Sequence, residues 1–266
     1  MSIISDRGVR LSAGATSLKR EDETLDTLFE GKLKLFQARS GYRFSLDALL
    51  LAHFMTCRHG EKIVDLGTGN GVIALILAYL DSSLSITGVE SQLSMIDRAS
   101  RNVRLNEFEA RVKITQADVA DIQKTFSPES FAAVVCNPPY RRTTSGRISP
   151  NAERKIARHE IAAGLADFLR AAAYLLPTKG RIALVYPALR LVDVLHSMRN
   201  ANLEPKRLRM VHSFADAKAA LVLTEGVKGG RSGGIEVLSP LNVYQTGKQY
   251  TAEVEAMLAG KAPPRY

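Results

Sequence analysis

The 266-residue sequence contains no tryptophan and only two cysteines, Cys57 and Cys136. Two thiols are too few for a disulfide framework or a cysteine-based metal site, and we expect both to stay reduced in a cytoplasmic location. No apolar run approaches the roughly 20 residues that cross a bilayer. Residues 1–20 also lack the apolar segment of a signal peptide. These absences argue against a membrane-spanning, secreted or disulfide-stabilised protein.

Acidic residues are outnumbered by basic ones. The sequence has 36 lysines and arginines against 27 acidic residues, a net charge of +9. An excess of this size is typical of proteins with an anionic partner such as nucleic acid, although a solvated cationic surface would also account for it. The five histidines have no spacing that resembles a metal site, so we predict no metal.

Apolar segments that read as strands alternate with segments of helical periodicity. We predict strands at 62–66, 85–89, 111–116, 131–136 and 181–186, and helices at 71–80, 92–106, 160–176 and 188–201. Such alternation indicates an α/β fold with a parallel sheet covered on both faces. No helix separates 206–212 from 219–224, so these segments should form an antiparallel pair, followed by a short strand near 235–238.

The N-terminal part has a different pattern. Residues 27–38 alternate around Glu30-Gly31, which predicts a hairpin. Ser45 is a candidate N-cap for a helix over 46–54. We therefore divide the chain into a flexible arm at 1–24, a hairpin and helix at 25–57 that pack on the core, and one large α/β domain at 58–266.

A glycine-rich turn follows the strand at 62–66 and opens a helix; its members are Gly67, Thr68, Gly69 and Gly71. The spacing G-x-G-x-G differs from the dinucleotide motif. Asp65 precedes the turn, where a carboxylate would repel a pyrophosphate but could hold an ammonium group. Glu90 ends the next strand, where it could accept hydrogen bonds from ribose hydroxyls. These features favour S-adenosyl-L-methionine, which has an ammonium group and no phosphate.

A second motif, Asn137-Pro138-Pro139-Tyr140, ends the apolar run at 131–136. An exocyclic amine conjugated to a ring is a poor nucleophile, and oxygen acceptors aimed at its N–H groups would favour attack in the transition state. The Asn137 side chain and the Pro138 carbonyl can supply those acceptors. Pro139 stiffens the turn, and Tyr140 offers a ring for stacking on a base. The motif predicts amine methylation.

Together, residues 37–48, 65–71, 137–140 and 158–160 resemble the bacterial tRNA1(Val) (adenine-N6)-methyltransferase family. The resemblance covers roughly residues 25 to 255. It implies a Rossmann-like, seven-stranded sheet of the class I methyltransferases, with the last strands antiparallel and a small N-terminal hairpin and helix appended. It further implies methylation of N6 of adenosine 37, beside the anticodon of a valine tRNA.

The same resemblance implies roles for individual residues. It places four residues near the methionine part of the cofactor: Arg43, Phe44, Ser45 and Asp47. It assigns Asp118, at the end of the third strand, to the adenine amino group, and Val119 to the adenine ring. Asp118 is, by itself, equally well explained as a helix N-cap.

A basic segment directly follows the Asn-Pro-Pro-Tyr motif. Residues 141–160 carry six cations and two glutamates, and we predict that five of the cations bind RNA phosphates: Arg141, Arg142, Arg147, Arg154 and Lys155. A solvated loop is the alternative. Four further cations form a second candidate patch, although an exposed strand face would carry such charges too: Lys206, Arg207, Arg209 and Lys218.

Three other functions remain compatible with these motifs. The amine could be the side-chain amide of a glutamine in a release factor, although such enzymes carry a larger N-terminal helical domain. It could belong to another base of RNA or DNA. The chain could also be a non-catalytic RNA-binding or cofactor-sensing module. The sequence leaves the tRNA identity and the oligomeric state open.

Overall fold

A nine-stranded sheet forms the centre of the computed structural model, which describes residues 18–40, 43, 45–139 and 164–261. The strand order is β10-β8-β9-β7-β6-β3-β4-β5, and β11 also pairs with β8. In chain order the strands are β3 (Lys62–Leu66), β4 (Ser85–Glu90), β5 (Val112–Gln116), β6 (Ala133–Cys136), β7 (Arg181–Pro187), β8 (Leu203–His212), β9 (Ala219–Lys228), β10 (Glu236–Val237) and β11 (Leu241–Asn242).

Strands β3 to β7 are parallel, and the chain order reverses between β3 and β6. Ligands bind α/β sheets at such a reversal. β9 runs antiparallel between β7 and β8, which confirms the predicted antiparallel pair. Among the last strands of the sheet, β9 runs antiparallel to the core strands, whereas β8, β10 and β11 run parallel to them. β10 and β11 extend the predicted seven strands to nine.

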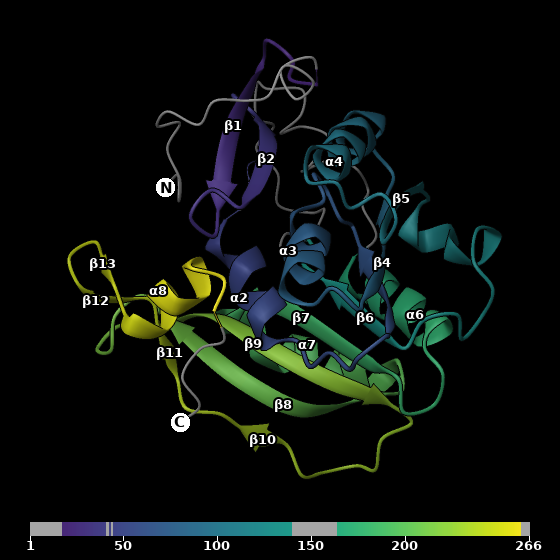
Figure 1. The fold of residues 1–266 in the computed structure, drawn as a ribbon. Helices are drawn as coiled ribbons and strands as arrows, with labels where there is room; N and C mark the ends of the chain where they lie inside the picture. Colours follow the sequence, from purple (N-terminus) through teal and green to yellow (C-terminus); the bar gives the residue numbers. More distant parts are fainter. Residues whose placement is uncertain (1–17, 41–42, 44, 140–163, 262–266) are drawn as a thin grey trace.

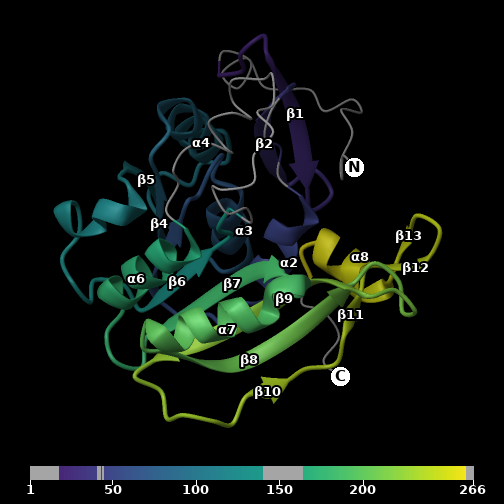
Figure 2. The ribbon, with the colours of Figure 1, turned by 180° about the vertical axis from the view of Figure 1, so that it is seen from behind.

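Helices cover both faces of the sheet. In Figure 1, α2 (Leu46–Phe54) and α3 (Val72–Leu80) lie in front of it, and α8 (Ala252–Leu258) packs against α2. Figure 2 shows α6 (Leu165–Leu175) and α7 (Leu191–Asn200) on the other face. A hydrophobic core lies on each face of the sheet, and alternate strand residues pack into one or the other. Val135 packs on the α2–α3 side and Val134 on the α6–α7 side. Both positions are fully buried, as expected for central parallel strands.

Most helices begin and end within two residues of the bounds predicted from the sequence. α3, α4 (Leu93–Leu105) and α6 match the predicted helices, although the first residues of the helix predicted at 160–176 lie outside the described residues. The helix predicted at 188–201 divides into a 3-10 turn, η2 (Ala188–Arg190), and α7. A second 3-10 helix, η1 (Val119–Lys124), follows β5.

The predicted N-terminal hairpin is present as β1 (Glu23–Leu28) and β2 (Leu33–Ala38). Its turn uses left-handed conformations at Phe29, Glu30 and Gly31. The hairpin stands beside α4 (Figure 1). A second small hairpin, β12 (Tyr244–Thr246) with β13 (Gln249–Tyr250), lies beside α8. Most of the predicted arm, residues 1–17, lies outside the described residues.

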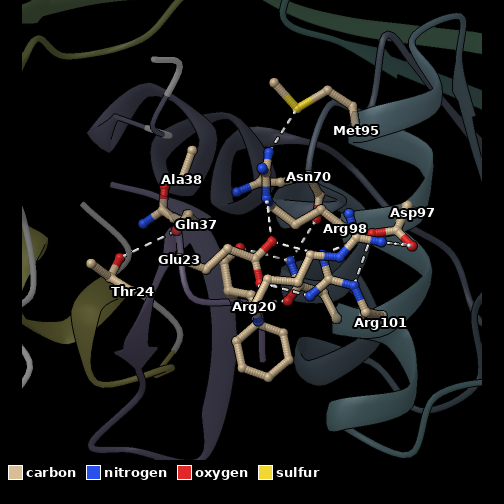
Figure 3. A network of polar contacts seen from close by, with 12 residues as sticks. Arg20, Glu23, Thr24, Gln37, Ala38, Asn70, Met95, Asp97, Arg98 and Arg101 are labelled. Carbon is tan, nitrogen blue, oxygen red and sulfur yellow. Dashed lines mark hydrogen bonds and ion pairs between the residues drawn. The ribbon is translucent and has the colours of Figure 1, made fainter. Parts of the chain in front are cut away.

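A buried ion-pair network fastens the hairpin to α4. Figure 3 shows the Glu23 carboxylate, which is fully buried, between the guanidinium groups of Arg98 and Arg101. Glu23 Oε1 accepts from Arg98 Nε at 2.9 Å and from Arg101 Nη2 at 2.6 Å. Burial alone would raise the pKa of Glu23, but hydrogen bonds from Arg101, the Arg20 amide and Arg98 outweigh it and hold the pKa at about 2.

Asn102 of α4 and Asn106, the C-cap of that helix, form the hydrogen bonds along β2 that a neighbouring strand would otherwise form. Asn102 accepts from the Phe36 amide at 2.7 Å and donates to the Phe36 carbonyl at 3.1 Å. Asn106 pairs in the same way with Lys34, at 2.9 and 2.7 Å. Four helical residues rise about 6 Å, close to the roughly 6.8 Å between alternate strand residues. The spacing of the amides therefore matches the edge of β2.

Candidate active site

The glycine turn lies at the carboxyl end of β3, where the strand order reverses. Gly67, Gly69 and Gly71 have φ angles of 70°, 59° and 86°, a region that side chains strongly disfavour. A Cβ added to Gly67 would lie 3.1 Å from Phe168 Cε1. Phe168 of α6 therefore covers the turn. Sequence reasoning missed this residue, because Phe168 looks like any apolar residue on the buried face of its helix.

Asp65 is the charged group at the base of the turn. Its side chain is fully buried, and the Thr68 hydroxyl donates to Oδ2 at 2.6 Å. Oδ1 has no hydrogen-bond partner among the described residues. Burial, with a contribution from the Glu90 charge, raises the pKa of Asp65 to about 7, and bonds from Thr68 and the Ala74 amide oppose the shift. An unsatisfied buried carboxylate oxygen suits a cationic ligand such as an ammonium group.

Glu90 ends β4, as predicted, and shapes the turn. Its Oε2 accepts from the Gly69 amide at 3.0 Å. Its Oε1 accepts from the amides of Ser91 and Gln92 at 2.9 and 3.0 Å. The Ser91 hydroxyl adds a long fourth bond to Oε1 at 3.5 Å. Oε2 accepts one bond and therefore keeps a lone pair for a further donor. Glu90 is thus held beside the glycine turn in a position to accept from a hydroxyl.

Asp118 departs from its expected place. β5 ends at Gln116, so the expectation that Asp118 closes the third strand was wrong. Asp118 instead caps η1, and its side chain accepts from the Ala120 amide at 2.9 Å. The alternative role stated for Asp118, that of a helix N-cap, is therefore present in the structure. Val119 follows as a buried residue of η1.

The Asn-Pro-Pro segment leaves β6 beside the glycine turn. Leu66 of β3 pairs with Cys136 of β6, so Gly67 and Asn137 follow at the same level of neighbouring strands. Asn137 is half-buried, Pro138 is buried and Pro139 is exposed. Tyr140 lies outside the described residues. The two motifs that sequence analysis singled out, 70 positions apart, thus meet at one point of the sheet.

The segment before α2 is placed only in part. The Arg43 guanidinium forms an ion pair with Asp26 and donates to Thr24 Oγ1 at 2.8 Å and to the Ala38 carbonyl at 3.0 Å. Arg43 therefore contacts the hairpin. Ser45 occupies the N-cap position of α2, as predicted, but its side chain makes no capping hydrogen bond. Asp47 lies in the first turn of α2, and Phe44 lies outside the described residues.

Asn70 connects the glycine turn to the hairpin. It is 2% exposed, its Oδ1 has no partner among the described residues, and its carbonyl accepts from Asn102 Nδ2 at 2.9 Å. Because Asn102 also binds both backbone groups of Phe36, one amide links the glycine turn, α4 and β2. The sequence offered only a weak signal for this, two asparagines four residues apart on a helix.

The predicted RNA-binding cations have different positions. Arg141, Arg142, Arg147, Arg154 and Lys155 lie outside the described residues. Most of the second candidate patch is engaged within the protein. Arg207 pairs with Glu225 and lies over the Phe54 ring, and Arg209 forms two bonds to Glu253. Lys206 donates to backbone carbonyls of the 231–233 turn. This patch mainly stabilises the edge of the sheet.

The described ranges contain no group of three or more His, Cys, Asp or Glu side chains arranged to hold a metal ion. In the same ranges no helix is long and apolar enough to span a membrane. Cys136 is fully buried, and burial raises the pKa of its thiol. Burial likewise raises the pKa of Cys57 to about 12. Neither thiol is available as a thiolate near neutral pH.

Comparison with solved structures supports the fold. A predicted O-methyltransferase from Agrobacterium tumefaciens superposes with a TM-score of 0.67 at 22% identity, covering 82% of this chain and 98% of that one. TYW2 from Pyrococcus horikoshii, solved in complex with MeSAdo, gives 0.55 at 13% identity, covering 79% and 73%. The sheet order, with one antiparallel strand inserted near its edge, and the glycine turn define a class I methyltransferase fold.

Sequence comparisons give the family. Residues 45–198 match the model of the methyltransferase small domain, and the chain belongs to that family. S-adenosyl-L-methionine is the methyl donor of such enzymes, and the buried acceptor on Asp65 fits its ammonium group.

Curated relatives carry the name tRNA1(Val) (adenine(37)-N6)-methyltransferase. The Tolumonas auensis protein is 30% identical over 152 residues, 57% of this chain and 62% of that protein. The Actinobacillus succinogenes protein is 28% identical over 225 residues, 81% of this chain and 88% of that protein. The resemblance predicted from the motifs is confirmed. The alignment with the Tolumonas protein spans under two thirds of that relative's length.

Proposed function

We propose that this protein methylates N6 of an adenosine in tRNA, at position 37 beside the anticodon of a valine tRNA, with S-adenosyl-L-methionine as donor. One observation carries the proposal. Leu66 and Cys136 are paired, so an amide-bearing Asn-Pro-Pro turn emerges directly beside the cofactor turn. An amine held at Asn137 would lie next to a methyl group presented over Gly67. The names of the curated relatives support the tRNA substrate.

The cofactor would be held by charge and by hydrogen bonds. The free Asp65 oxygen would accept from its ammonium group, and Glu90 from its ribose hydroxyls. The glycine turn would approach the cofactor closely, with Val119 against the adenine. When bound, the cofactor supplies an electrophilic methyl group on sulfur. The chain itself has only to position and polarise the acceptor nitrogen.

Adenine N6 must be made a better nucleophile, because its lone pair is delocalised into the ring. Oxygen atoms of Asn137 and Pro138 that accept its two N–H groups would favour the pyramidal nitrogen of the transition state over the planar ground state. No strong base is needed before attack, since the proton leaves once nitrogen is cationic. Tyr140 would stack on the base and fix its plane.

The basic segment at 141–160 favours a nucleic acid as the substrate. Arg141, Arg142, Arg147, Arg154 and Lys155 follow the motif in sequence and would neutralise phosphates that flank the target base. A base in an anticodon loop is already unpaired, so less free energy is needed to move it into a pocket. The proposal places the enzyme in the cytoplasm, where tRNA is found.

The direct test is methyl transfer from tritiated S-adenosyl-L-methionine to total tRNA from a strain lacking the gene. We expect label in N6-methyladenosine of a valine tRNA, and none in a transcript with guanosine at position 37. Asn137→Ala is the matched catalytic control: it should bind cofactor normally and transfer methyl at least about a hundredfold more slowly, as for loss of an oriented transition-state donor or acceptor.

The outcomes separate the proposal from its alternatives. Label in a glutamine of a release factor, and not in tRNA, would establish the protein-methylating function instead. Cofactor binding without transfer to any RNA or protein would indicate a non-catalytic module. If Asn137→Ala loses cofactor binding but keeps normal turnover per bound cofactor, the role assigned to the Asn-Pro-Pro turn is wrong.

A further inference from the structure

Three aromatic rings gather beyond the carboxyl end of β8, two of them stacked and the third tilted against them. Tyr244 stacks on Tyr250 with centroids 5.1 Å apart and planes 20° apart, and Phe214 lies 5.6 Å from Tyr244 on a tilt of 37°. All three rings are half-buried, so each keeps a part of its surface exposed to solvent. We call these three residues the aromatic surface.

The aromatic surface is rigidly built from two segments. Phe214 lies in the turn after β8, and the two tyrosines pair with each other across the β12–β13 hairpin. The Tyr244 amide donates to the Ser213 carbonyl at 2.9 Å, and the Val243 amide to the His212 carbonyl at 2.8 Å. These bonds seat the hairpin on the end of β8. The rings are therefore held in place before any ligand arrives.

The aromatic surface faces the same edge of the sheet as the active site. β8 is parallel to β6, so His212, the last residue of β8, and Asn137, which follows β6, lie at the carboxyl ends of their strands. In Figures 1 and 2 the β12–β13 hairpin lies beyond the end toward which β8 points. The rings lie three strand spacings from β6 across the sheet and about five residues farther along the strand direction than Asn137. The rings and Asn137 are therefore separated by a distance on the order of 20 Å. A stacked nucleic-acid strand covers that distance in about six nucleotides.

The charge around the rings favours an anion. Lys218 and Lys248 are both exposed, in the turn after β8 and in the β12–β13 hairpin. Neither forms an ion pair with any residue that the structure describes. Asp216 is the exposed acidic residue of the Phe214 turn. Exposed aromatic rings flanked by unpaired cations are the features by which proteins bind single-stranded nucleic acid, through base stacking and phosphate contacts.

We propose that Phe214, Tyr244 and Tyr250 form a stacking site for an unpaired nucleobase of the substrate RNA, several nucleotides from the base to be methylated. The proposal rests on the function proposed above, since the RNA in question is the substrate. Lys218 and Lys248 contact the phosphates on either side of the stacked base. The site contributes affinity for RNA and takes no part in methyl transfer.

The absence of tryptophan from the natural chain gives a direct test. Tyr244→Trp places the single tryptophan of the protein in the aromatic surface, where stacking of a base quenches its fluorescence. We expect total tRNA from the strain lacking the gene to quench this fluorescence saturably. The tRNA concentration that gives half of the quenching should equal the concentration that half-saturates binding. Val237→Trp is the matched control, because Val237 is 64% exposed on β10, away from the rings. It should show no quenching.

Leucine and phenylalanine variants at Tyr244 distinguish stacking on an aromatic ring from contact with any apolar side chain. Tyr244→Leu should weaken tRNA binding by about tenfold, in the range measured for loss of one stacked base. Its cofactor affinity and its kcat at saturating tRNA should be unchanged. Tyr244→Phe should bind tRNA like the natural protein. The proposal is overturned if Tyr244→Trp binds tRNA without quenching, or if the leucine variant, with an unchanged melting temperature, binds tRNA as tightly as the natural protein.

Failure of the proposed function is a separate result. If the natural protein transfers no methyl group to tRNA, the function proposed above is wrong, whereas quenching of Tyr244→Trp by RNA still supports the stacking site. Normal methylation without quenching refutes the stacking site alone. A tryptophan signal that responds to protein concentration, and not to RNA, would identify the surface as a contact between copies of the chain and would also overturn the proposal.

Discussion

At the scale of single residues, Asp65 has the most perturbed environment in the site. Its carboxyl is buried without a full set of hydrogen-bond partners, and its pKa is raised to about 7, first by burial and then by the Glu90 charge. A cationic ammonium group binds the ionised form. Cofactor binding should therefore remove the Asp65 proton, and the affinity should rise with pH as Asp65 ionises.

For a site with a pKa near 7, the dissociation constant should fall by about tenfold between pH 6 and pH 7.5, provided the protonated form does not bind. The range stays below the ordinary pKa of an α-amino group, so most of the ligand remains cationic. Isothermal titration over this range measures the effect. Asp65→Asn should bind weakly and lose the pH dependence. A pH-independent affinity in the natural protein would contradict the assignment.

The same shift affects folding of the cofactor-free protein. Between pH 3.8 and about 7 the folded state retains a proton on Asp65 that the unfolded chain has lost. The contribution of Asp65 to stability therefore decreases as pH rises through this window. Glu23 has the opposite sign: its pKa of about 2 means that its contribution is present above pH 4.5 and is lost as pH falls toward 2.

Residue-level reasoning succeeded where a motif fixes the backbone and failed where contacts are long-range. Gly67 and Glu90 occupy the predicted ends of β3 and β4, because turn geometry and strand ends are local properties. Nothing local marks Phe168 as the cover of Gly67, or Asp26 as the partner of Arg43. Those contacts join segments far apart in the sequence or buried among other apolar residues.

At the scale of elements, Asn102 joins α4 and the hairpin to the glycine turn. Its amide makes three hydrogen bonds, two to Phe36 and one to the Asn70 carbonyl. Asn106 makes the same pair of bonds to Lys34, one helical turn away, but its third bond is to its own helix. The two asparagines therefore differ in contact with the glycine turn, and also in burial, since Asn102 is fully buried and Asn106 half-buried.

This difference predicts different phenotypes. Asn106→Ala should lower the free energy of unfolding by about 1–3 kcal/mol, the usual cost of unpaired buried groups, with cofactor affinity unchanged. Asn102→Ala should destabilise by a similar amount and also weaken cofactor binding, because the Asn70 carbonyl loses its donor. Urea unfolding and isothermal titration measure the two effects. Equal cofactor affinities in the two variants would refute the coupling through Asn102.

The elements themselves were predictable from periodicity, and their edges were not. Burial on both faces makes β6 and β7 continuous apolar runs that are easy to recognise. β10 and β11 have two residues each, too short for any pattern. Their direction depends on where the chain returns along β8, and this is decided by tertiary packing.

At the scale of the whole molecule, the net charge is +9, but not every cation is exposed to a partner. Several arginines are buried in ion pairs, among them Arg101 with Glu23 and Arg181 with Glu61. These pairs fix the hairpin and the strands and cannot bind phosphate. The cations available to RNA are therefore fewer than the sequence suggests.

The basic segment after the Asn-Pro-Pro-Tyr motif allows a test of which cations bind the phosphates of RNA. Replacing Arg141 and Arg142 by glutamate should weaken tRNA binding. It should also flatten the plot of log Kd against log salt by roughly 1.5, because two phosphates of the RNA would no longer be neutralised. Lys62→Glu is the control, because Lys62 is exposed at the amino end of β3, opposite the site. Filter binding across salt concentrations measures the slopes. Equal slopes in the double variant and the natural protein would exclude the segment from phosphate binding.

The side-chain amides along β2 also bear on how this protein meets other chains. An uncovered strand edge is a template on which a second polypeptide can add itself, and many proteins block such edges with charge or proline. Here a helix does so, with two carboxamides that imitate a peptide backbone. Without both amides, the backbone groups of Lys34 and Phe36 would lose these partners. We expect such a chain to keep its glycine and Asn-Pro-Pro turns and to aggregate more readily.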